Sequence, residues 1–165
     1  MIARNQLIGL IAGVVLMVAA ITGALLVGGD TSHSSAEAVV RSYLIAVYEN
    51  GDASQYLTLF DPVDMQELEA EYGIPMEEVR DELQASLDGF HEQMASEGMS
   101  FSWEIEDTTA LNATAETTVA MRFSHPMYGD DEYPEIVATV ERDGRWYLAV
   151  QPLNDFLMWY LSRES

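Results

Sequence analysis

Residues 76–105 read MEEVRDELQASLDGFHEQMASEGMSFSWEI, and the spacing of the apolar residues changes within this stretch. Before Gly98 the apolar residues recur every three or four positions, which is the period of a helix with one buried face. They are Met76, Val79, Leu83, Leu87, Phe90 and Met94. After Gly98, the residues Phe101, Trp103 and Ile105 alternate with polar residues, as in a strand that buries one face. The stretch therefore predicts a long helix followed by a sheet.

Helical patterns also precede this stretch. A first helix is expected to begin after the Ser34-Ser35 pair, which can cap it, and to end at Asn50-Gly51. Its apolar residues at helical spacing are Val40, Tyr43, Leu44 and Val47. Two short helices follow, one capped by Asp52 and stopped before Pro62, and one capped by Asp64.

Three further strands are expected after the first. Residues 125–134 (HPMYGDDEYP) form an acidic loop between the second and third strands, and Leu111-Asn112 and Asp143-Gly144 form the two turns. The expected inward residues are Ala115, Thr117, Val119, Met121 and Phe123, then Ile136, Ala138 and Val140, then Trp146, Leu148 and Val150. A short helix over residues 156–161 ends the chain. This order predicts an α+β domain with helices packed on one face of a curved antiparallel sheet of about four strands.

An uncharged apolar run precedes this domain. Residues 7–27 (LIGLIAGVVLMVAAITGALLV) span about 32 Å as a helix, enough to cross the hydrocarbon core of a membrane. We therefore expect a transmembrane helix over residues 7–28. The division is then a cytoplasmic N-terminus (1–6), this helix, a polar linker (29–35) and an extracytoplasmic domain (36–165).

The charges beside the run set its expected direction. Arg4 precedes the run and the acidic residues follow it, which by the positive-inside rule places the domain outside the cell membrane. A cleaved signal peptide, cut near Ser34-Ser35-Ala36, is the alternative, but the run is longer than an ordinary signal-peptide core. Gly9 and Gly13 form a G-x-x-x-G pair, through which two anchors could pack.

Composition excludes several chemistries. The chain has no cysteine, so disulfides, thiolate catalysis and cysteine-bound metals are excluded. Its net charge is −21 and it has no lysine, so it repels nucleic acid and attracts cations and basic partners. An acidic surface without lysine also suits adaptation to high salt, and this reading stays open.

Catalytic and metal-binding signals are weak. His91 begins HEQMA and lacks the second histidine of H-E-x-x-H, because position 95 is alanine. No phosphate-binding loop and no nucleophile motif occurs, so no cofactor and no metal are expected. If the space between sheet and helices is catalytic, the candidates are Tyr43, Tyr56, His91 and His125. Each of these residue types is more often part of a core or a rim.

Three other features of the sequence give expectations. Asn112 begins a glycosylation sequon on a predicted turn. His33 falls in the linker, where solvent is its expected surrounding. Phe156, Trp159 and Tyr160 are expected to pack on the domain rather than to lie at the membrane surface.

Two segments carry a resemblance to a known family. Residues 36–60 (AEAVVRSYLIAVYENGDASQYLTLF), with a Gly51-Asp52 turn, and residues 140–150 (VERDGRWYLAV), with an Asp143-Gly144 turn before Trp146, resemble the nuclear transport factor 2-like superfamily, also called the cystatin-like cone or SnoaL-like fold. The resemblance covers about residues 36–151. It implies a conical cavity between the sheet and the long helix. Some members are isomerases or dehydratases that use a pocket carboxylate, Tyr or His, and others are binding or dimerisation modules.

The expected function follows from the anchor and the lack of a catalytic constellation. The leading hypothesis is a membrane-anchored binding or assembly module without catalysis, whose partner is another copy, a membrane complex or a small apolar ligand. The first alternative is a small isomerase-like or dehydratase-like enzyme. The second is an acid-rich surface domain adapted to high salt.

Overall fold

The computed structural model describes residues 32–164 of the 165-residue chain. Five α-helices and four strands occur in this part, together with a π-helix, η1. They are α2 (Ala36–Leu44), η1 (Ile45–Asn50), α3 (Ala53–Leu57), α4 (Pro62–Tyr72), α5 (Met76–Ser96), β1 (Ser100–Leu111), β2 (Thr114–His125), β3 (Gly129–Arg142), β4 (Arg145–Leu148) and α6 (Gln151–Glu164). The predicted transmembrane segment 7–28, with Gly9 and Gly13, lies outside the described residues. Within residues 32–164, no helix combines the length and the apolar character needed to span a membrane.

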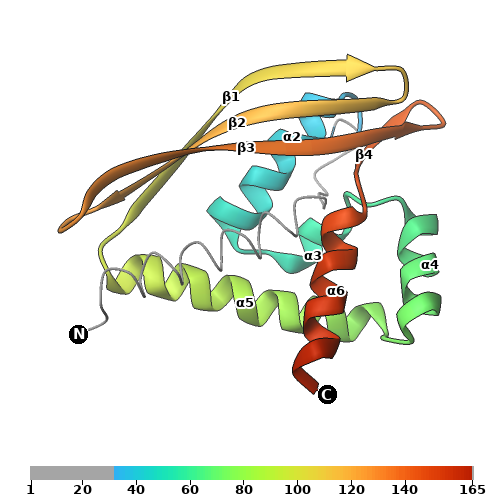
Figure 1. The fold of residues 1–165 in the computed structure, drawn as a ribbon, viewed down its shortest axis with the longest axis horizontal. Coiled ribbons are helices and arrows are strands. Elements are labelled where there is room, and N and C mark those ends of the chain that lie inside the picture. The colour runs from blue at the N-terminus through green and yellow to red at the C-terminus, as the bar shows by residue number, and fades with distance from the viewer. Residues whose placement is uncertain (1–31, 165) are drawn as a thin grey trace.

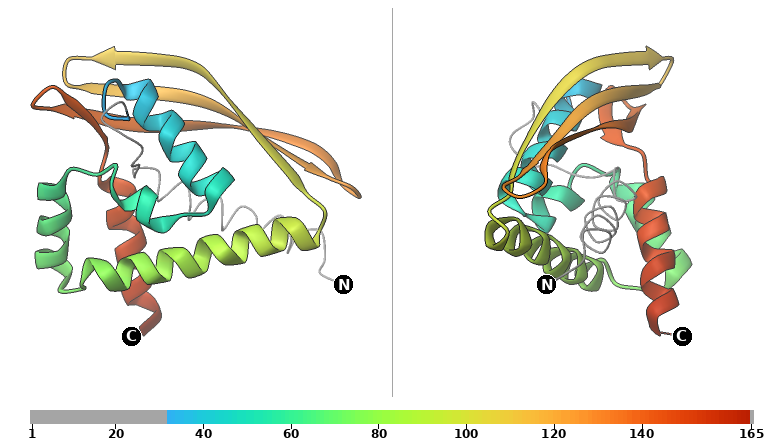
Figure 2. Two further views of the ribbon diagram at one scale, coloured as in Figure 1. Left: turned by 180° about the vertical axis from the view of Figure 1, so that it is seen from behind. Right: turned by 60° about the vertical axis from the view of Figure 1, so that its left-hand side comes forward.

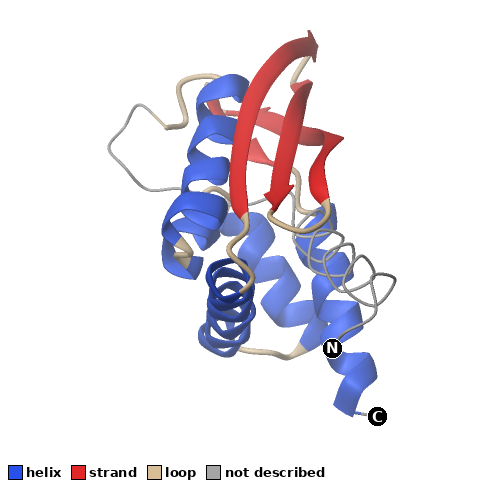
Figure 3. Cartoon of the chain, turned by 90° about the vertical axis from the view of Figure 1, so that its left-hand side faces the viewer, coloured by secondary structure: helices blue, strands red, loops and turns tan. Residues whose placement is uncertain are grey.

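The α+β class is confirmed. The strands form one antiparallel sheet in the order β1-β2-β3-β4, and the sheet is strongly curved. The described helices lie on one face of the sheet, with α5 running beneath it and α2 between the two (Figures 1 and 2). The opposite face of the sheet carries no described helix (Figure 3).

Helix starts and stripes agree largely with the sequence pattern. Ser35 caps α2 by accepting from the backbone N–H of Ala38, and Asp52 caps α3 by accepting from that of Gln55. The predicted α5 stripe is turned inward, with Val79, Leu83, Leu87 and Phe90 buried and Met76 and Met94 half-buried against the core.

The predicted cap of α4 is wrong. Asp61, not Asp64, caps this helix, because the Asp61 carboxylate accepts from the Val63 N–H at 2.8 Å and Pro62 suits the first helical position. Asp64 lies one turn further on and is buried. Its carboxylate accepts a hydrogen bond from Arg142 at the end of β3. Asp64 therefore ties α4 to the sheet.

The third strand begins earlier than predicted. The expected acidic loop over residues 125–134 is mostly strand, since β3 begins at Gly129 and pairs with β2 from Gly129 to Val140. On the edge of β3 that faces away from β2, Pro134 interrupts no hydrogen bond, because β4 pairs only with residues 139–142 of β3. Acidic residues 130–132 are exposed, so their charges stay in water.

The inward face of β3 is also the opposite of the predicted one. Glu135, Val137 and Thr139 are buried, whereas Ile136 is 62% exposed. Register explains the difference, since Glu135 pairs with the inward-facing Val119 of β2 and cross-strand partners share a face.

The two tight turns lie close to their predicted places. Asp143 and Gly144 both have positive φ, as a type I′ turn requires. The β1–β2 turn centres on Asn112-Ala113, one residue later than expected, with Asn112 exposed at φ 58°. Glycosylation at Asn112 stays a prediction.

The prediction that His33 is solvated is wrong. Its side chain is 7% exposed, and its Nδ1–H donates to the Trp146 carbonyl at 2.6 Å. The Trp146 N–H donates back to the His33 carbonyl at 3.0 Å, and Tyr147 packs on the imidazole at 4.9 Å between ring centroids. The chain is therefore docked on β4 before α2 begins.

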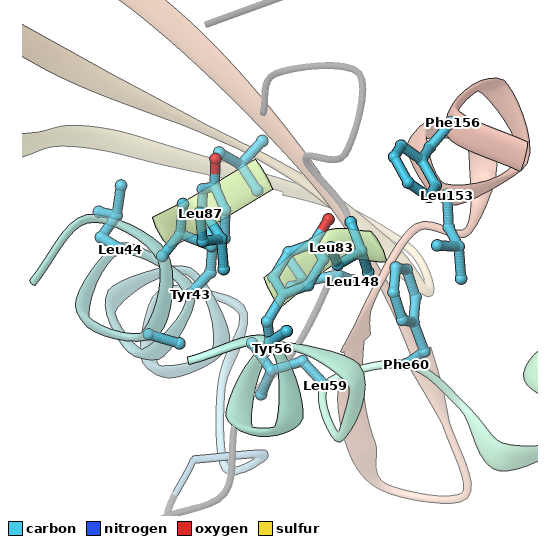
Figure 4. Close-up of a cluster of buried hydrophobic side chains, with 14 of the residues drawn as sticks. Tyr43, Leu44, Tyr56, Leu59, Phe60, Leu83, Leu87, Leu148, Leu153 and Phe156 are labelled. Atoms are coloured by element: carbon cyan, nitrogen blue, oxygen red, sulfur yellow. The ribbon is translucent and has the colours of Figure 1, made fainter. Parts of the chain in front are cut away.

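The last helix is longer than the predicted 156–161. It begins at Gln151 and lies beside α4 and α5 (Figure 1). Phe156 is 2% exposed, and the Tyr160 hydroxyl donates to Glu78 of α5, so packing of these two residues on the domain is confirmed. The side chain of Trp159 lies outside the described part. One continuous apolar core runs from Tyr43 and Leu87 to Phe156 (Figure 4).

Candidate functional site

Four ionisable side chains meet inside the core, and we call them the buried tyrosine cluster: Tyr43, Tyr48, Tyr56 and Glu135. Tyr43 of α2 donates its hydroxyl hydrogen to a Glu135 carboxylate oxygen at 2.9 Å. The ring of Tyr43 contacts those of Tyr48 and Tyr56, with centroids 6.0 and 6.2 Å away. All three tyrosines are at most 5% exposed, and Glu135 is 8% exposed. A carboxyl group in such a place is poorly solvated, so its interaction with the phenol is strong.

Burial dominates the proton affinities of the three phenols. It raises the pKa of Tyr43 well above the ordinary 10.0, and the nearby Glu135 charge raises it further. Burial likewise raises the pKa of Tyr48, with Glu135 as the next cause, and that of Tyr56, with Tyr48 as the next cause. The Tyr48 hydroxyl is buried without a hydrogen bond of good geometry among the described residues.

A groove of about 470 Å³ lies next to this cluster, and we call it the α5–β1 groove. It is lined by Tyr48, Glu49, Phe90, His91, Met94, Met99, Phe101, Ser102 and Trp103. Tyr48 belongs to both places, because its ring stacks on Phe101 at 4.5 Å and meets Phe90 edge-on at 6.0 Å. The groove is open to solvent, and its lining combines apolar side chains with the polar ones of Glu49, His91 and Ser102.

The π-helix sets where two of these side chains lie. η1 continues α2 and carries Tyr48 and Glu49. Segments of π-helix are rare and occur often at functional sites. His91 of α5 secures the end of η1, because its Nε2–H donates to the Val47 carbonyl at 2.9 Å. Gly51 ends the segment at φ 60°, in the left-handed region that suits glycine.

The rim of the groove carries one anionic side chain held in place. Trp103 donates its indole N–H to the Glu49 carboxylate at 3.1 Å. The Arg41 guanidinium lies 5.7 Å from the centroid of the Trp103 ring, within the range of a cation–π interaction. Arg41 itself pairs with Glu37 on α2.

The structure brings together some of the predicted site residues. Tyr43 and Tyr56 meet in the buried tyrosine cluster, and His91 lines the groove. His125 lines neither place. It is buried at the β2–β3 turn, where its Nδ1 accepts from the Met127 N–H at 2.9 Å and its Nε2 lies 3.6 Å from a Glu97 carboxylate oxygen.

Sequence reasoning missed Tyr48, Glu49 and Glu135. The sequence pattern predicts that β3 buries Ile136, which would turn the neighbouring Glu135 toward solvent. Glu135 was therefore not expected at the site. Tyr48 and Glu49 follow the predicted α2 stripe, and nothing in their spacing signals a π-helix.

No group of three or more His, Asp or Glu side chains within residues 32–164 is placed to hold a metal ion. No model of a known protein family matches the chain, and no curated protein matches it either. The nuclear transport factor 2-like resemblance and the adaptation to high salt therefore stay predictions.

Proposed function

We propose that this chain is a binding module, held at the outer surface of a membrane by residues 7–28, that takes the apolar part of a small ligand in the α5–β1 groove. The observation that carries the proposal is the lining of the groove. Four aromatic rings and two methionines meet there around a space of about 470 Å³. Volumes of this order, with apolar walls and a few polar groups, are typical of small-molecule sites.

Two further features support the proposal. Methionine side chains adapt to ligands of varied shape, and Met94 and Met99 are only half-buried. Helices that precede a curved four-stranded meander are the element order that the nuclear transport factor 2-like resemblance implies. The length of the apolar run and the charges beside it support the proposed anchor.

The test places the full chain in lipid nanodiscs and follows its methionine methyl groups by NMR. We expect the chain to co-purify with lipid, which tests the anchor. Titration with hexanol should then move the Met94 and Met99 methyl resonances in a saturable way. Met127 and Met158, which are 74% and 58% exposed, serve as internal controls and should not move.

A matched pair of variants localises the binding. Met94→Gln removes apolar surface from the groove and should weaken hexanol binding about tenfold, with Met99 as the reporter. Met158→Gln makes the same change on α6 and should leave the affinity unaltered. Recovery of the chain free of lipid would contradict the membrane anchor. Met94 and Met99 resonances that do not move would contradict the ligand site.

A second candidate function is proton transfer at the buried tyrosine cluster, of the isomerase or dehydratase type. The contact between Tyr43 and Glu135 favours it, because a carboxyl beside a phenol is suited to acid–base chemistry. The full chain should then convert a small β,γ-unsaturated ketone, and Glu135→Gln should slow this turnover at least about 100-fold with folding intact. Ile136→Ala, at the exposed neighbouring position, is the control. A wild-type rate equal to that of buffer would reject this candidate.

A further inference from the structure

The carboxylate at the rim of the α5–β1 groove has no cationic partner among the residues that the structure describes. Glu49 is exposed and lines the groove, and its carboxylate accepts a hydrogen bond from the neutral indole N–H of Trp103 at 3.1 Å. Within residues 32–164 it forms no ion pair, although Arg41 lies over the same Trp103 ring. The hydrogen bond fixes the carboxylate beside the groove and leaves its charge uncompensated.

The walls beside Glu49 also favour positive charge. The faces of aromatic rings attract cations, and Tyr48, Phe90, Phe101 and Trp103 supply four rings to the groove. The position of the Arg41 guanidinium, 5.7 Å from the Trp103 centroid, shows that this indole already takes part in such a contact.

The remaining charges disfavour an anion. Among residues 32–164, His91 is the only basic side chain that lines the groove, and its Nε2–H donates to the Val47 carbonyl. The chain as a whole carries a net charge of −21 and has no lysine, so the surrounding field repels anions and concentrates cations.

We infer that the α5–β1 groove selects small organic cations, with the apolar body of the ligand between Met94, Met99 and the rings and its positive charge at Glu49. This inference rests on the proposed ligand site and adds the charge of the ligand to it. The size of the groove suits a small molecule with one charged group.

The test compares three probes that share a hexyl chain: hexyltrimethylammonium, hexanol and hexyl sulfate. Each is titrated into the full chain in nanodiscs of uncharged lipid, with the Met94 and Met99 methyl resonances as readout. We expect the cation to bind about tenfold more tightly than hexanol, because one ion pair at a surface and one cation–π contact add to the same apolar contact. Hexyl sulfate should bind more weakly than hexanol.

Two glutamate variants separate local contact from the general field. Glu49→Gln keeps an acceptor for the Trp103 N–H and removes the charge, so the preference for the cation over hexanol should fall to about threefold or less. Glu69→Gln makes the same charge change at an exposed position of α4 and should keep the tenfold preference. Equal binding of all three probes would overturn the inference and leave the ligand site intact. A preference that stays at about tenfold in Glu49→Gln would overturn it as well. Absence of binding by any probe would overturn both the inference and the ligand site.

Discussion

Above pH 10 the free energy of unfolding should fall by about 4 kcal/mol for each further pH unit. Tyr43, Tyr48 and Tyr56 have pKa values raised well above the ordinary 10.0, first of all by burial. Their protons are therefore retained in the folded state at a pH at which the unfolded chain releases them. Each such proton contributes a slope of about 1.4 kcal/mol per pH unit, so three give about 4. Below pH 10 both states keep these protons and the contribution is constant.

The composition leaves few groups other than tyrosine that titrate in this pH range. The chain has no lysine and no cysteine, and arginine keeps its proton to above about pH 12, so tyrosines dominate titration between about pH 9 and 12. Tyrosinate absorbance and circular dichroism, followed together in chemical unfolding at successive pH values, measure the slope. Burial predicts that the cluster phenols ionise only with unfolding. Ionisation of all eight tyrosines in the folded protein near pH 10 would contradict the closed cluster.

One phenol can be removed from the cluster at little cost. Within residues 32–164 the Tyr48 hydroxyl makes no hydrogen bond of good geometry, so Tyr48→Phe should leave the free energy of unfolding at pH 7 unchanged or slightly raised. The slope above pH 10 should fall by about a third, because one of three protons is gone. Tyr128→Phe removes a phenol that is 39% exposed and serves as the control, with an unchanged slope expected.

The helices and the order of the strands could be predicted because their causes are local. A helix that buries one face needs apolar residues every three or four positions, and α5 shows this spacing from Met76 to Met94. The Asp143-Gly144 turn needs two positive φ angles, which few residue pairs adopt readily. The inward face of β3 has no such local cause. Ile136, Val137, Ala138 and Val140 offer apolar side chains to both faces, and pairing with β2 decides between them.

The candidate site was less predictable for the same reason. Its residues come from α2, η1, α3, α5, β1 and β3, and only packing places Glu135 beside Tyr43. Two of the four candidate residues, Tyr43 and Tyr56, do lie in the buried cluster. The inward position of Glu135, the partner of Tyr43, follows from the register of β3 against β2. The π-helix η1 carries Glu49 at the rim of the groove, and His91 and Gly51 support η1.

The contact between Gly51 and His91 gives the second large prediction. A Cβ at position 51 would lie 2.9 Å from His91 Cδ2, closer than side-chain carbons approach one another, and the residue would have to keep φ 60°. Gly51→Ala should therefore lower the free energy of unfolding by about 3 kcal/mol. About 1 kcal/mol comes from the left-handed backbone, and about 2 from displacement of His91, which leaves the Val47 carbonyl without its hydrogen bond.

Gly73 supplies the matched control. It has φ 67°, and a Cβ there would meet nothing within 4 Å, so Gly73→Ala should cost about 1 kcal/mol through the backbone alone. In a His91→Ala background the cost of Gly51→Ala should fall to the same value, because no imidazole is left to displace. Chemical unfolding followed by circular dichroism measures all four changes. Equal losses at the two glycines in the wild-type background would show that His91 does not hold η1. If His91 does hold it, Gly51→Ala should also weaken hexanol binding, since displaced η1 carries Tyr48 and Glu49 away from the groove.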